Sequence, residues 1–261
     1  MTNDLEWIDT PAAGLRLPGL AGKTAVVTGA SSGIGKAAAL LLLANEVRVF
    51  GLARSERYLE HPGFTPIACD LSDVASIDAA FATIRRAAPR LDYLINVAGN
   101  DPKYSIDEVT VEQWDRLVDL NLRAYYFVIK LALPLLRAGA GRSIVNVSSI
   151  NYRLGVPGRA AYSATKSGIL GLTTGLSREL GRERIRINTV SPGWTFTERQ
   201  IEEYFDTPES EKYLGFLAER QSVRLKILPT DVANHILFYL SDFSRASTGH
   251  NCIVDGGWLL E

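Results

Sequence analysis

The sequence beyond Gly22 alternates short runs of β-branched residues with longer runs of helical composition. This alternation is typical of βαβ units, in which helices connect parallel strands and cover both faces of their sheet. It predicts an α/β fold with a Rossmann-like, doubly wound parallel sheet. A chain of 261 residues is long enough for one domain of this kind, and no linker-like tract interrupts it after Lys23. We therefore expect a single domain over residues 23–261, preceded by an N-terminal arm over residues 1–22.

The individual elements are expected from the hydrophobic periodicity and from the turn residues between the runs. Asn45 is expected to end the first helix in a left-handed conformation, which asparagine tolerates. The strands are expected at Lys23–Thr28, Val47–Leu52, Thr65–Cys69, Leu91–Asn96, Ser143–Val147, Ile185–Val190 and Cys252–Val254. The helices are expected at Gly33–Ala44, Val74–Ala87, Val111–Arg137, Ala161–Gly181 and Thr230–Leu240.

The composition is that of an ordinary globular enzyme, with 46% hydrophobic and 22% charged residues. A formal net charge of -1 gives no electrostatic reason to expect nucleic acid or an anionic membrane as a partner. Cys69 and Cys252 lie in apolar contexts without ligand-like spacing, so we expect buried free thiols, a reducing compartment and no metal site.

Leu5 and Trp7 are expected to pack the arm onto the domain. The absence of a leader-like segment or a membrane-spanning apolar run predicts a cytoplasmic protein.

A glycine-rich segment, Thr28–Gly35, follows the first expected strand and opens the first expected helix. Glycines at such a position allow a sharp turn and let the backbone approach a pyrophosphate closely. The N-terminus of the helix then offers unpaired N–H groups and a positive dipole end to the phosphates. A plain tight turn is the alternative, but the strand, helix and second strand that the motif requires are all expected here. The candidate cofactor-binding residues of this turn are Gly29, Ser31, Ser32, Gly33, Ile34 and Gly35.

The end of the second expected strand bears on which dinucleotide is bound. An acidic residue there would hydrogen-bond the ribose 2′-hydroxyl and repel a 2′-phosphate. The segment Gly51–Ser55 has no carboxylate and carries Arg54, which can pair with a 2′-phosphate as a charge-assisted donor. NADP is therefore favoured, with NAD as the alternative and a solvated strand-end arginine as the other interpretation of Arg54.

Tyr162 and Lys166 lie four residues apart in the fourth expected helix, so that both side chains fall on one helix face. A nearby ammonium favours the phenolate form of a tyrosine. Lowering the pKa from about 10 by 2–3 units takes roughly 3–4 kcal/mol, which a close and partly desolvated cation can supply. Such a tyrosine can take a proton from an alcohol as hydride leaves. Taken alone, the pair is more often a matter of packing on a helix surface.

In combination these motifs resemble the short-chain dehydrogenase/reductase family, and the resemblance extends over nearly the whole chain from Lys23 onward. Thr28–Gly35 matches the family's T-G-x-x-x-G-I-G turn, and Tyr162–Lys166 matches its Y-x-x-x-K core, with threonine at the fourth position. Asn96–Gly99 matches the N-N-A-G segment, with Val97 in place of the usual second asparagine. The resemblance implies an NAD(P)-dependent oxidoreductase that moves hydride between the nicotinamide and a secondary alcohol or carbonyl.

The resemblance also implies roles for single residues. Ser149, thirteen residues before Tyr162, would hydrogen-bond the reacting oxygen. Asn121 would hold a helix kink and position a proton-relay water. Together with Ser149, Tyr162 and Lys166, it would complete the catalytic set. Asp70 would contact the adenine amino group. Further cofactor contacts are implied for Leu71, Asn96, Ala98, Gly99, Tyr162, Lys166, Pro192, Gly193, Thr195 and Thr197.

The long segment after the sixth expected strand, about residues 194–224, is a natural substrate lid. Its sequence resembles the bacterial sugar dehydrogenases of the family, of the D-xylose 1-dehydrogenase type, which oxidise an anomeric hydroxyl to a lactone. The segment Ser148–Tyr152 differs from the version typical of the xylose enzymes, so the identity of the sugar does not transfer. Loop capping and packing are the alternative for each polar or aromatic candidate here. The candidate substrate-binding residues are Asn100, Asn151, Trp194 and Gln200, with Asp101 and Tyr152 also able to contribute.

Two other functions stay open at this point. A 3-oxoacyl thioester reductase or general carbonyl reductase would be favoured by a basic patch at the site entrance, for which Arg153 and Arg159 are the nearby candidates. A cofactor-sensing regulator would not need the complete set of proton-transfer residues. By resemblance, the helices expected at 111–137 and 161–181 would form subunit contacts in a homotetramer, with a dimer as the alternative.

Overall fold

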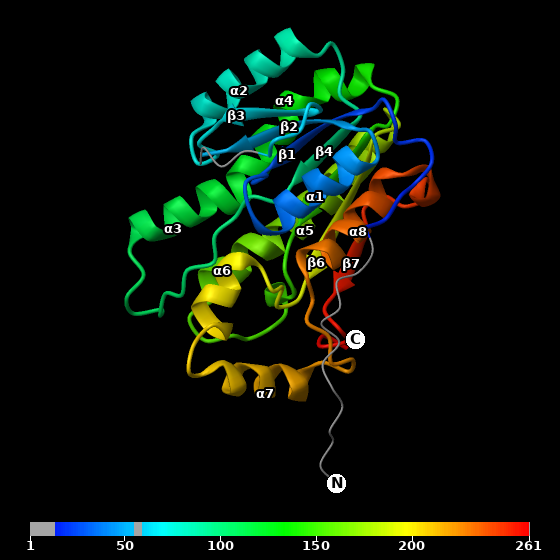
Figure 1. The fold of residues 1–261 in the computed structure, drawn as a ribbon. Helices are drawn as coiled ribbons and strands as arrows, with labels where there is room; N and C mark the ends of the chain where they lie inside the picture. Colours follow the sequence, from blue (N-terminus) through cyan, green and yellow to red (C-terminus); the bar gives the residue numbers. More distant parts are fainter. Residues whose placement is uncertain (1–13, 55–58, 261) are drawn as a thin grey trace.

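A seven-stranded parallel sheet with the order β3-β2-β1-β4-β5-β6-β7 forms the centre of the molecule (Figure 1). The structure is a computed structural model that describes residues 14–54 and 59–260. The chain begins in the middle of the sheet at β1, builds outward to β3 and then returns to continue from β4 on the other side of β1. The predicted doubly wound sheet is thereby confirmed. The strands are β1 (Thr24–Thr28), β2 (Arg48–Ala53), β3 (Phe64–Ala68), β4 (Tyr93–Asn96), β5 (Ser143–Val147), β6 (Arg186–Pro192) and β7 (Asn251–Val254).

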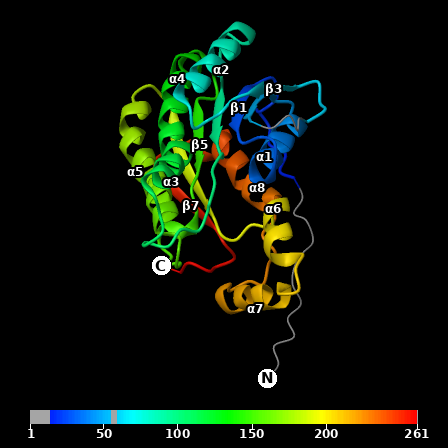
Figure 2. The same ribbon diagram turned by 90° about the vertical axis from the view of Figure 1, so that its left-hand side faces the viewer.

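Helices cover both faces of this sheet, as the alternating pattern predicts (Figure 2). On one face α1 and α8 pack together and bury Leu42 and Ile236. On the other face α2, α4 and α5 bury Phe81, Leu136 and Leu180. The helices are α1 (Gly33–Ala44), α2 (Val74–Ala87), α3 (Val111–Val118), α4 (Ala124–Ala138), α5 (Ala160–Gly181), α6 (Glu198–Gln200), α7 (Ser210–Arg220) and α8 (Pro229–Leu240).

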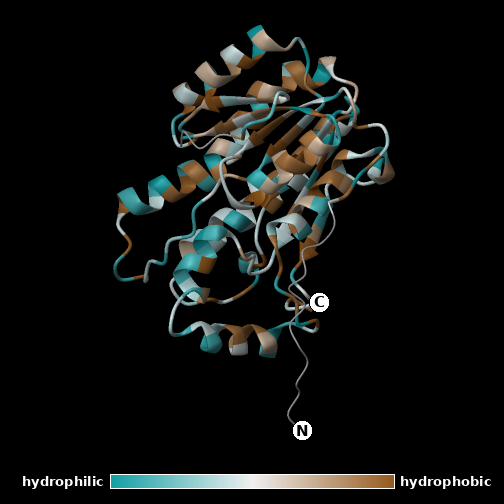
Figure 3. Cartoon of the chain, viewed as in Figure 1, coloured by the Kyte–Doolittle hydropathy of each residue, from teal (hydrophilic) through white to brown (hydrophobic). Residues whose placement is uncertain are grey.

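The central strands are apolar on both sides because both of their faces are covered. Ala25, Val26 and Val27 of β1 are fully buried, with alternate side chains entering the two separate hydrophobic clusters. Figure 3 shows the strands in brown between helices whose outer surfaces carry teal, polar residues. The apolar core therefore occupies the two faces of the sheet, and residues at the ends of the strands line a cavity instead.

The carboxyl ends of the strands meet along one edge of the sheet, and the order of the strands reverses there between β1 and β4. Ligands of doubly wound sheets bind in the crevice at this reversal. The Thr28 hydroxyl ties the two strand ends together, since it accepts hydrogen bonds from the backbone N–H groups of Val97 (3.0 Å) and Ala98 (3.2 Å). The loops that follow β1 and β4 are thereby held side by side.

The predicted helix over residues 111–137 was wrong in one respect. It is interrupted by a π-helical turn at Asp119–Arg123, between α3 and α4. A π turn has i→i+5 hydrogen bonds in place of i→i+4 bonds, and such turns are frequent at functional sites. Asn121 lies within it and is fully buried. Periodicity alone does not reveal this local change of helical pitch.

The end of α1 also differs from the prediction. Asn45 is not left-handed (φ -94°, ψ 18°), and the left-handed residue is Glu46 with φ 60°. The buried Asn45 side chain instead donates to the carbonyls of Leu15 (2.9 Å) and Leu41 (2.8 Å) and accepts from the N–H of Leu17 (2.8 Å). It therefore binds the segment before β1 to the end of α1. Leu5 and Trp7 of the predicted arm lie outside the described residues.

Two further expectations concern cysteines and membranes. Cys69 is buried, whereas Cys252 is only partly buried, so the expectation of a buried thiol was wrong for Cys252. Among the described residues, no helix is long and apolar enough to cross a membrane.

Candidate active site

The glycine-rich turn between β1 and α1 has the close backbone packing that a phosphate cradle needs. Gly29 and Gly33 have left-handed φ angles of 70° and 50°, a region that other residues rarely adopt. A Cβ atom on Gly35 would lie 2.1 Å from the Gly29 carbonyl oxygen, so only glycine allows α1 to start this close to the turn. Because the turn delivers the N-terminus of α1 to the cavity, its residues fit the phosphates of a dinucleotide.

One cavity of about 750 Å³ connects this turn with Tyr162. Its wall is built from the ends of β1, β4, β5 and β6 and from the segment after β6, so residues distant in sequence meet at one edge of the sheet. No group of three or more His, Cys, Asp or Glu residues suited to a metal ion occurs in the described part of the chain. The predicted site residues on the wall are Gly29, Ser31, Ser32, Gly33, Ile34, Gly35, Arg54, Leu71, Ala98, Gly99, Asn100, Ser149, Asn151, Tyr162, Lys166, Pro192, Gly193, Trp194, Thr195, Thr197 and Gln200.

Three predicted site residues, Asp70, Asn96 and Asn121, are not brought to this wall. Asn96 is buried in the sheet, where its amide donates to Asn146 Oδ1 on β5 at 3.0 Å. One Asp70 carboxylate oxygen accepts hydrogen bonds from the Ser72 hydroxyl (2.7 Å) and N–H (3.0 Å). These bonds hold the pKa of Asp70 below its usual value. Neither side chain faces the cavity, although the neighbouring residues Leu71 and Ala98 do.

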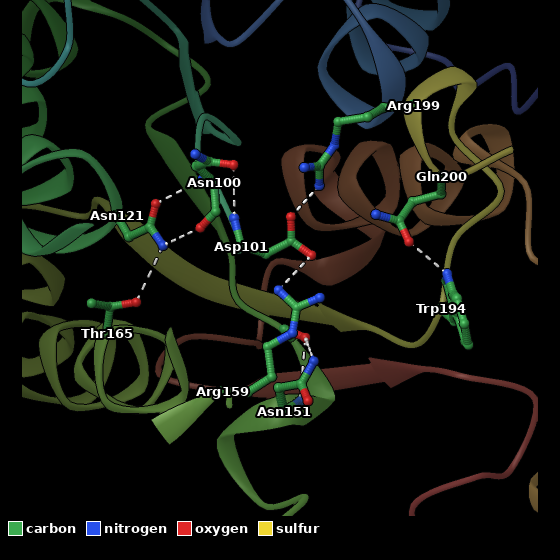
Figure 4. A network of polar contacts seen from close by, with 10 residues as sticks. Asn100, Asp101, Asn121, Asn151, Arg159, Thr165, Trp194, Arg199 and Gln200 are labelled. Carbon is green, nitrogen blue, oxygen red and sulfur yellow. Dashed lines mark hydrogen bonds and ion pairs between the residues drawn. The ribbon is translucent and has the colours of Figure 1, made fainter. Parts of the chain in front are cut away.

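Asn121 lies behind the wall and connects two parts of it (Figure 4). Its Oδ1 accepts from the Asn100 N–H at 2.8 Å, and its Nδ2 donates to the Asn100 carbonyl at 2.7 Å and to Thr165 Oγ1 at 3.3 Å. Thr165 Oγ1 in turn donates to the Tyr162 carbonyl at 2.7 Å. The π turn thus uses Asn121 to join the loop after β4 to the first turns of α5.

Tyr162 and Lys166 share one face of α5, as their spacing predicts, but they make no direct hydrogen bond with each other among the described contacts. The Lys166 ammonium lies 5.7 Å from the centroid of the Tyr162 ring and donates to the Val147 carbonyl at 3.1 Å. Ser148 is also part of this arrangement, since its hydroxyl donates to the Lys166 carbonyl at 2.8 Å. The end of β5 therefore positions both the backbone and the ammonium of Lys166.

The pKa of Tyr162 is raised, which is opposite to the net shift expected from the nearby Lys166 ammonium. Burial, and after it the Asp101 carboxylate, raise the pKa of Tyr162 to about 12, while a hydrogen bond with Ser149 and the charges of Arg159 and Arg199 lower it in part. Burial also lowers the pKa of Lys166 to about 8. The cause is the same for both groups, because a low-dielectric wall disfavours a phenolate and an ammonium alike.

A charged network beside Tyr162 was missed by the sequence analysis as a unit. Asp101, on the loop after β4, pairs with Arg159 at the start of α5 and with Arg199 of α6 (Figure 4). Arg159 Nη1 lies 3.1 Å from Asp101 Oδ2, and all three residues line the cavity. Sequence reasoning considered Arg159 only as part of a basic patch, since the carboxylate that pairs with it lies 58 positions earlier in the chain. The network links the segment after β6 to the centre of the site.

The segment after β6 places a wall of aromatic rings over the cavity. Trp194 packs edge-on against Tyr204 (5.1 Å between centroids) and Tyr213 (5.8 Å), and lies 5.3 Å from Phe205. Its indole N–H donates to Gln200 Oε1 at 2.6 Å. Trp194 and Gln200 therefore bind each other, as the packing alternative proposed, and both still line the cavity.

The same segment contacts the glycine-rich turn through Glu198. Its Oε2 accepts from the Gly33 N–H at 3.1 Å, and its Oε1 lies 3.8 Å from the Lys36 ammonium on α1. A Cβ on Gly33 would come within 3.0 Å of the Thr197 methyl. The start of α1 therefore contacts the start of α6 directly, and residues of both line the cavity.

Comparison with known proteins agrees with this architecture. Residues 29–259 match the family model described as enoyl-(acyl carrier protein) reductase. D-xylose 1-dehydrogenase from Caulobacter vibrioides (strain NA1000 / CB15N) is 36% identical over 250 residues, covering 92% of this chain and 97% of that protein. "Probable galactose dehydrogenase" from Rhizobium meliloti (strain 1021) is 33% identical, with coverage of 93% and 97%.

Similarity is not restricted to proteins named for sugars. A 3-oxoacyl-[acyl-carrier-protein] reductase from Thermotoga maritima is 31% identical, covering 92% of this chain and 99% of that protein. Among solved structures, the ligand-free aldohexose dehydrogenase of Thermoplasma acidophilum superposes with a TM-score of 0.85 at 27% identity, covering 92% of this chain and 94% of that one.

Proposed function

The chain belongs to the short-chain dehydrogenase/reductase family, and from this we propose that it oxidises an aldose at the anomeric carbon to an aldonolactone, with NADP preferred to NAD. The observation that carries the proposal is the composition of the cavity around Tyr162. Amide and charged groups of Asn100, Asp101 and Asn151 line one part of it, and the aromatic wall around Trp194 lines another. A sugar ring offers several hydroxyls for the polar groups and a flat C–H face for the rings.

The proton leaves the substrate hydroxyl for Tyr162 in this proposal. Ser149 hydrogen-bonds Tyr162 and so lies where the reacting oxygen must come. Lys166, held by the Val147 carbonyl, keeps a positive charge near the ring and favours the phenolate. Asn121 fixes the loop after β4 against α5 and so keeps the cavity wall in register with Tyr162.

The residues that would hold the dinucleotide are those on the other half of the wall. The turn Gly29–Gly35 fits the phosphates, and Arg54 lies on the wall at the end of β2, where a 2′-phosphate would find a cation. Pro192 ends β6, and Gly193 and Thr195 follow it next to the aromatic wall. When bound, an oxidised nicotinamide supplies the acceptor for the hydride that leaves the anomeric carbon.

A panel of aldoses tests the proposal directly. Each aldose is mixed with the protein and with NADP or NAD, and the absorbance of the reduced cofactor is followed. We expect at least one aldose to reduce NADP, and to do so with a higher kcat/KM than a simple secondary alcohol. If no aldose reduces either cofactor while a 3-oxoacyl thioester oxidises the reduced form, the sugar assignment is wrong and the acyl reductase is the function.

The pH dependence of this oxidation should respond to Asp101. The rate rises with pH because the phenolate form of Tyr162 accepts the proton, and the Asp101 carboxylate raises the pKa of Tyr162. Asp101→Asn is therefore expected to move the acidic limb of the kcat/KM profile to lower pH. Asp107→Asn, a change of an exposed carboxylate in the same loop, should leave the limb in place. A limb that stays or moves to higher pH in Asp101→Asn would contradict the electrostatic role of Asp101.

Arg54 should set the preference between the two dinucleotides. A charge-assisted hydrogen bond contributes about 1.5–3 kcal/mol, so Arg54→Ala is expected to lower kcat/KM for NADP by about 10–100-fold and to change NAD much less. Arg48→Ala, at the opposite end of β2, is the matched control and should preserve the ratio of the two values. An unchanged NADP/NAD ratio in Arg54→Ala would show that this arginine is only solvated.

The acyl reductase alternative finds less support in the site. Arg159, which could have formed a docking patch for an acidic carrier, is 9% exposed and is paired with Asp101.

A homotetramer stays a prediction of the family resemblance. The exposed rings of Trp114 on α3 and Tyr126 on α4 fit a subunit contact, and light scattering of the purified protein would measure the number of subunits.

A further inference from the structure

Arg159 has an unused hydrogen-bonding group on the cavity wall. The residue is 9% exposed, and its guanidinium lies 5.9 Å from the centroid of the Tyr162 ring. Its Nη1 is in ion-pair contact with Asp101 Oδ2 at 3.1 Å, yet this buried nitrogen makes no hydrogen bond to any described residue. Asp101 is therefore in ion-pair contact with Arg159 without using the N–H donors of Nη1.

Asn151 has the complementary unused group. It follows Ser149 on the short turn after β5, and its backbone N–H and its Nδ2 both donate to Ser149 Oγ, at 3.2 and 3.4 Å. Its Oδ1 is buried and accepts no hydrogen bond from the described part of the chain. A free acceptor therefore lies next to the hydroxyl that contacts Tyr162.

A buried donor and a buried acceptor without partners each cost about 1–3 kcal/mol, so they persist where a ligand supplies the missing bonds. Both Arg159 and Asn151 line the cavity that contains Tyr162. The chemistry of the pair selects the ligand group. A carboxylate has no hydrogen to donate to Asn151, and an ammonium has no lone pair for Arg159, whereas a hydroxyl both accepts and donates.

We propose that Arg159 and Asn151 form a subsite for a substrate hydroxyl next to the reacting carbon, which in an aldose is the hydroxyl on C2. The hydroxyl oxygen accepts from Arg159 Nη1, and its hydrogen is donated to Asn151 Oδ1. The subsite rests on the proposed oxidation of an aldose and assigns the recognition of one of its hydroxyls. Asp101 is then a positioning residue that holds the guanidinium in place.

The expected consequence is strong discrimination against a deoxy sugar. A site built to hydrogen-bond a hydroxyl rejects an analogue that lacks it, because both protein groups are left unpaired. With the best aldose of the panel and its 2-deoxy form, we expect wild-type kcat/KM values that differ by about 100-fold or more. The ratio of these two values is the readout for the subsite.

Two single variants and their combination test the assignment. Asn151→Ala removes the acceptor, and Arg159→Lys keeps the charge and the pairing with Asp101 but loses the second N–H branch. Each should reduce the hydroxy/deoxy ratio at least tenfold. The double variant should reduce it no further than the stronger single variant, because both residues bind the same hydroxyl. In Arg159→Lys the pH profile should be unchanged, which separates hydroxyl binding from a purely electrostatic role.

Arg137→Lys, an exposed arginine paired with Glu183 outside the cavity, is the matched control and should leave the ratio at its wild-type value. Thermal unfolding and dinucleotide affinity of each variant show whether the fold and the cofactor half of the cavity are intact. Aldose oxidation without discrimination in the wild type, or variants that keep the wild-type ratio, would overturn the subsite while leaving the proposed function standing. A wild type that oxidises no aldose would overturn both.

Discussion

Tyr162→Phe is expected to lower the turnover of the enzyme by about 1,000-fold, because it removes the hydroxyl that exchanges the proton during hydride transfer. The phenyl ring still fills its place on the cavity wall, so the affinity for the dinucleotide should change by no more than the contribution of one hydrogen bond, about 0.5–1.5 kcal/mol. Steady-state kinetics with the best substrate measures the first quantity, and fluorescence titration with the reduced cofactor measures the second.

Tyr93→Phe is the matched control for this variant. Tyr93 is a buried tyrosine that lies at the start of β4, at the opposite end of that strand from the cavity. Its turnover should stay within a factor of two of the wild type. Substantial turnover retained in Tyr162→Phe would contradict the proton-transfer role, and a loss of dinucleotide binding would show that the ring also shapes the cofactor half of the cavity.

Gly35→Ala is expected to have the second large effect, on dinucleotide binding and on stability together. The added Cβ would meet the Gly29 carbonyl oxygen at 2.1 Å, so α1 must move away from the turn. Overpacking of this kind costs about 1–3 kcal/mol in the free energy of unfolding. Because the same movement disrupts the phosphate cradle, we expect the Kd for NADP to rise by about 100-fold, measured by calorimetric titration.

Gly215→Ala provides the contrast. Gly215 lies on the exposed side of α7, and a Cβ there would contact nothing within 4 Å. Alanine in place of glycine inside a helix should raise the free energy of unfolding by about 0.5–1 kcal/mol. Urea denaturation of the two variants should therefore give changes of opposite sign. Equal changes, or an unaltered Kd in Gly35→Ala, would show that the turn is more plastic than its geometry implies.

The fold and the geometry of the glycine-rich turn could be predicted from the sequence because their signals are local. Strand and helix limits depend on short-range periodicity, and α2 and β5 occur at the predicted residues. The conformation of Gly29 and the close approach at Gly35 belong to a short turn, and the spacing of its glycines alone predicts both features. The common edge where parallel strands end then brings Tyr162 to this turn.

Features that depend on contacts between distant segments could not be predicted. The pairing of Asp101 with both Arg159 and Arg199 requires the loop after β4, the start of α5 and α6 to meet. The raised pKa of Tyr162 follows from burial in that wall, which its spacing to Lys166 does not reveal. The role of Asn45 is similar, since its partners Leu15 and Leu17 are recognised only when the segment before β1 is seen against α1.

The location of the site at one edge of the sheet has an evolutionary consequence. The two hydrophobic clusters that stabilise the fold lie on the faces of the sheet, whereas the aromatic wall and Arg199 belong to a segment between β6 and α8. That segment can therefore accumulate substitutions, or be exchanged between relatives, while Tyr162, Lys166 and the glycine-rich turn keep their support from the sheet. One part of the cavity wall can thus vary in a stretch of the gene that is separate from the stretches encoding Tyr162, Lys166 and the glycine-rich turn.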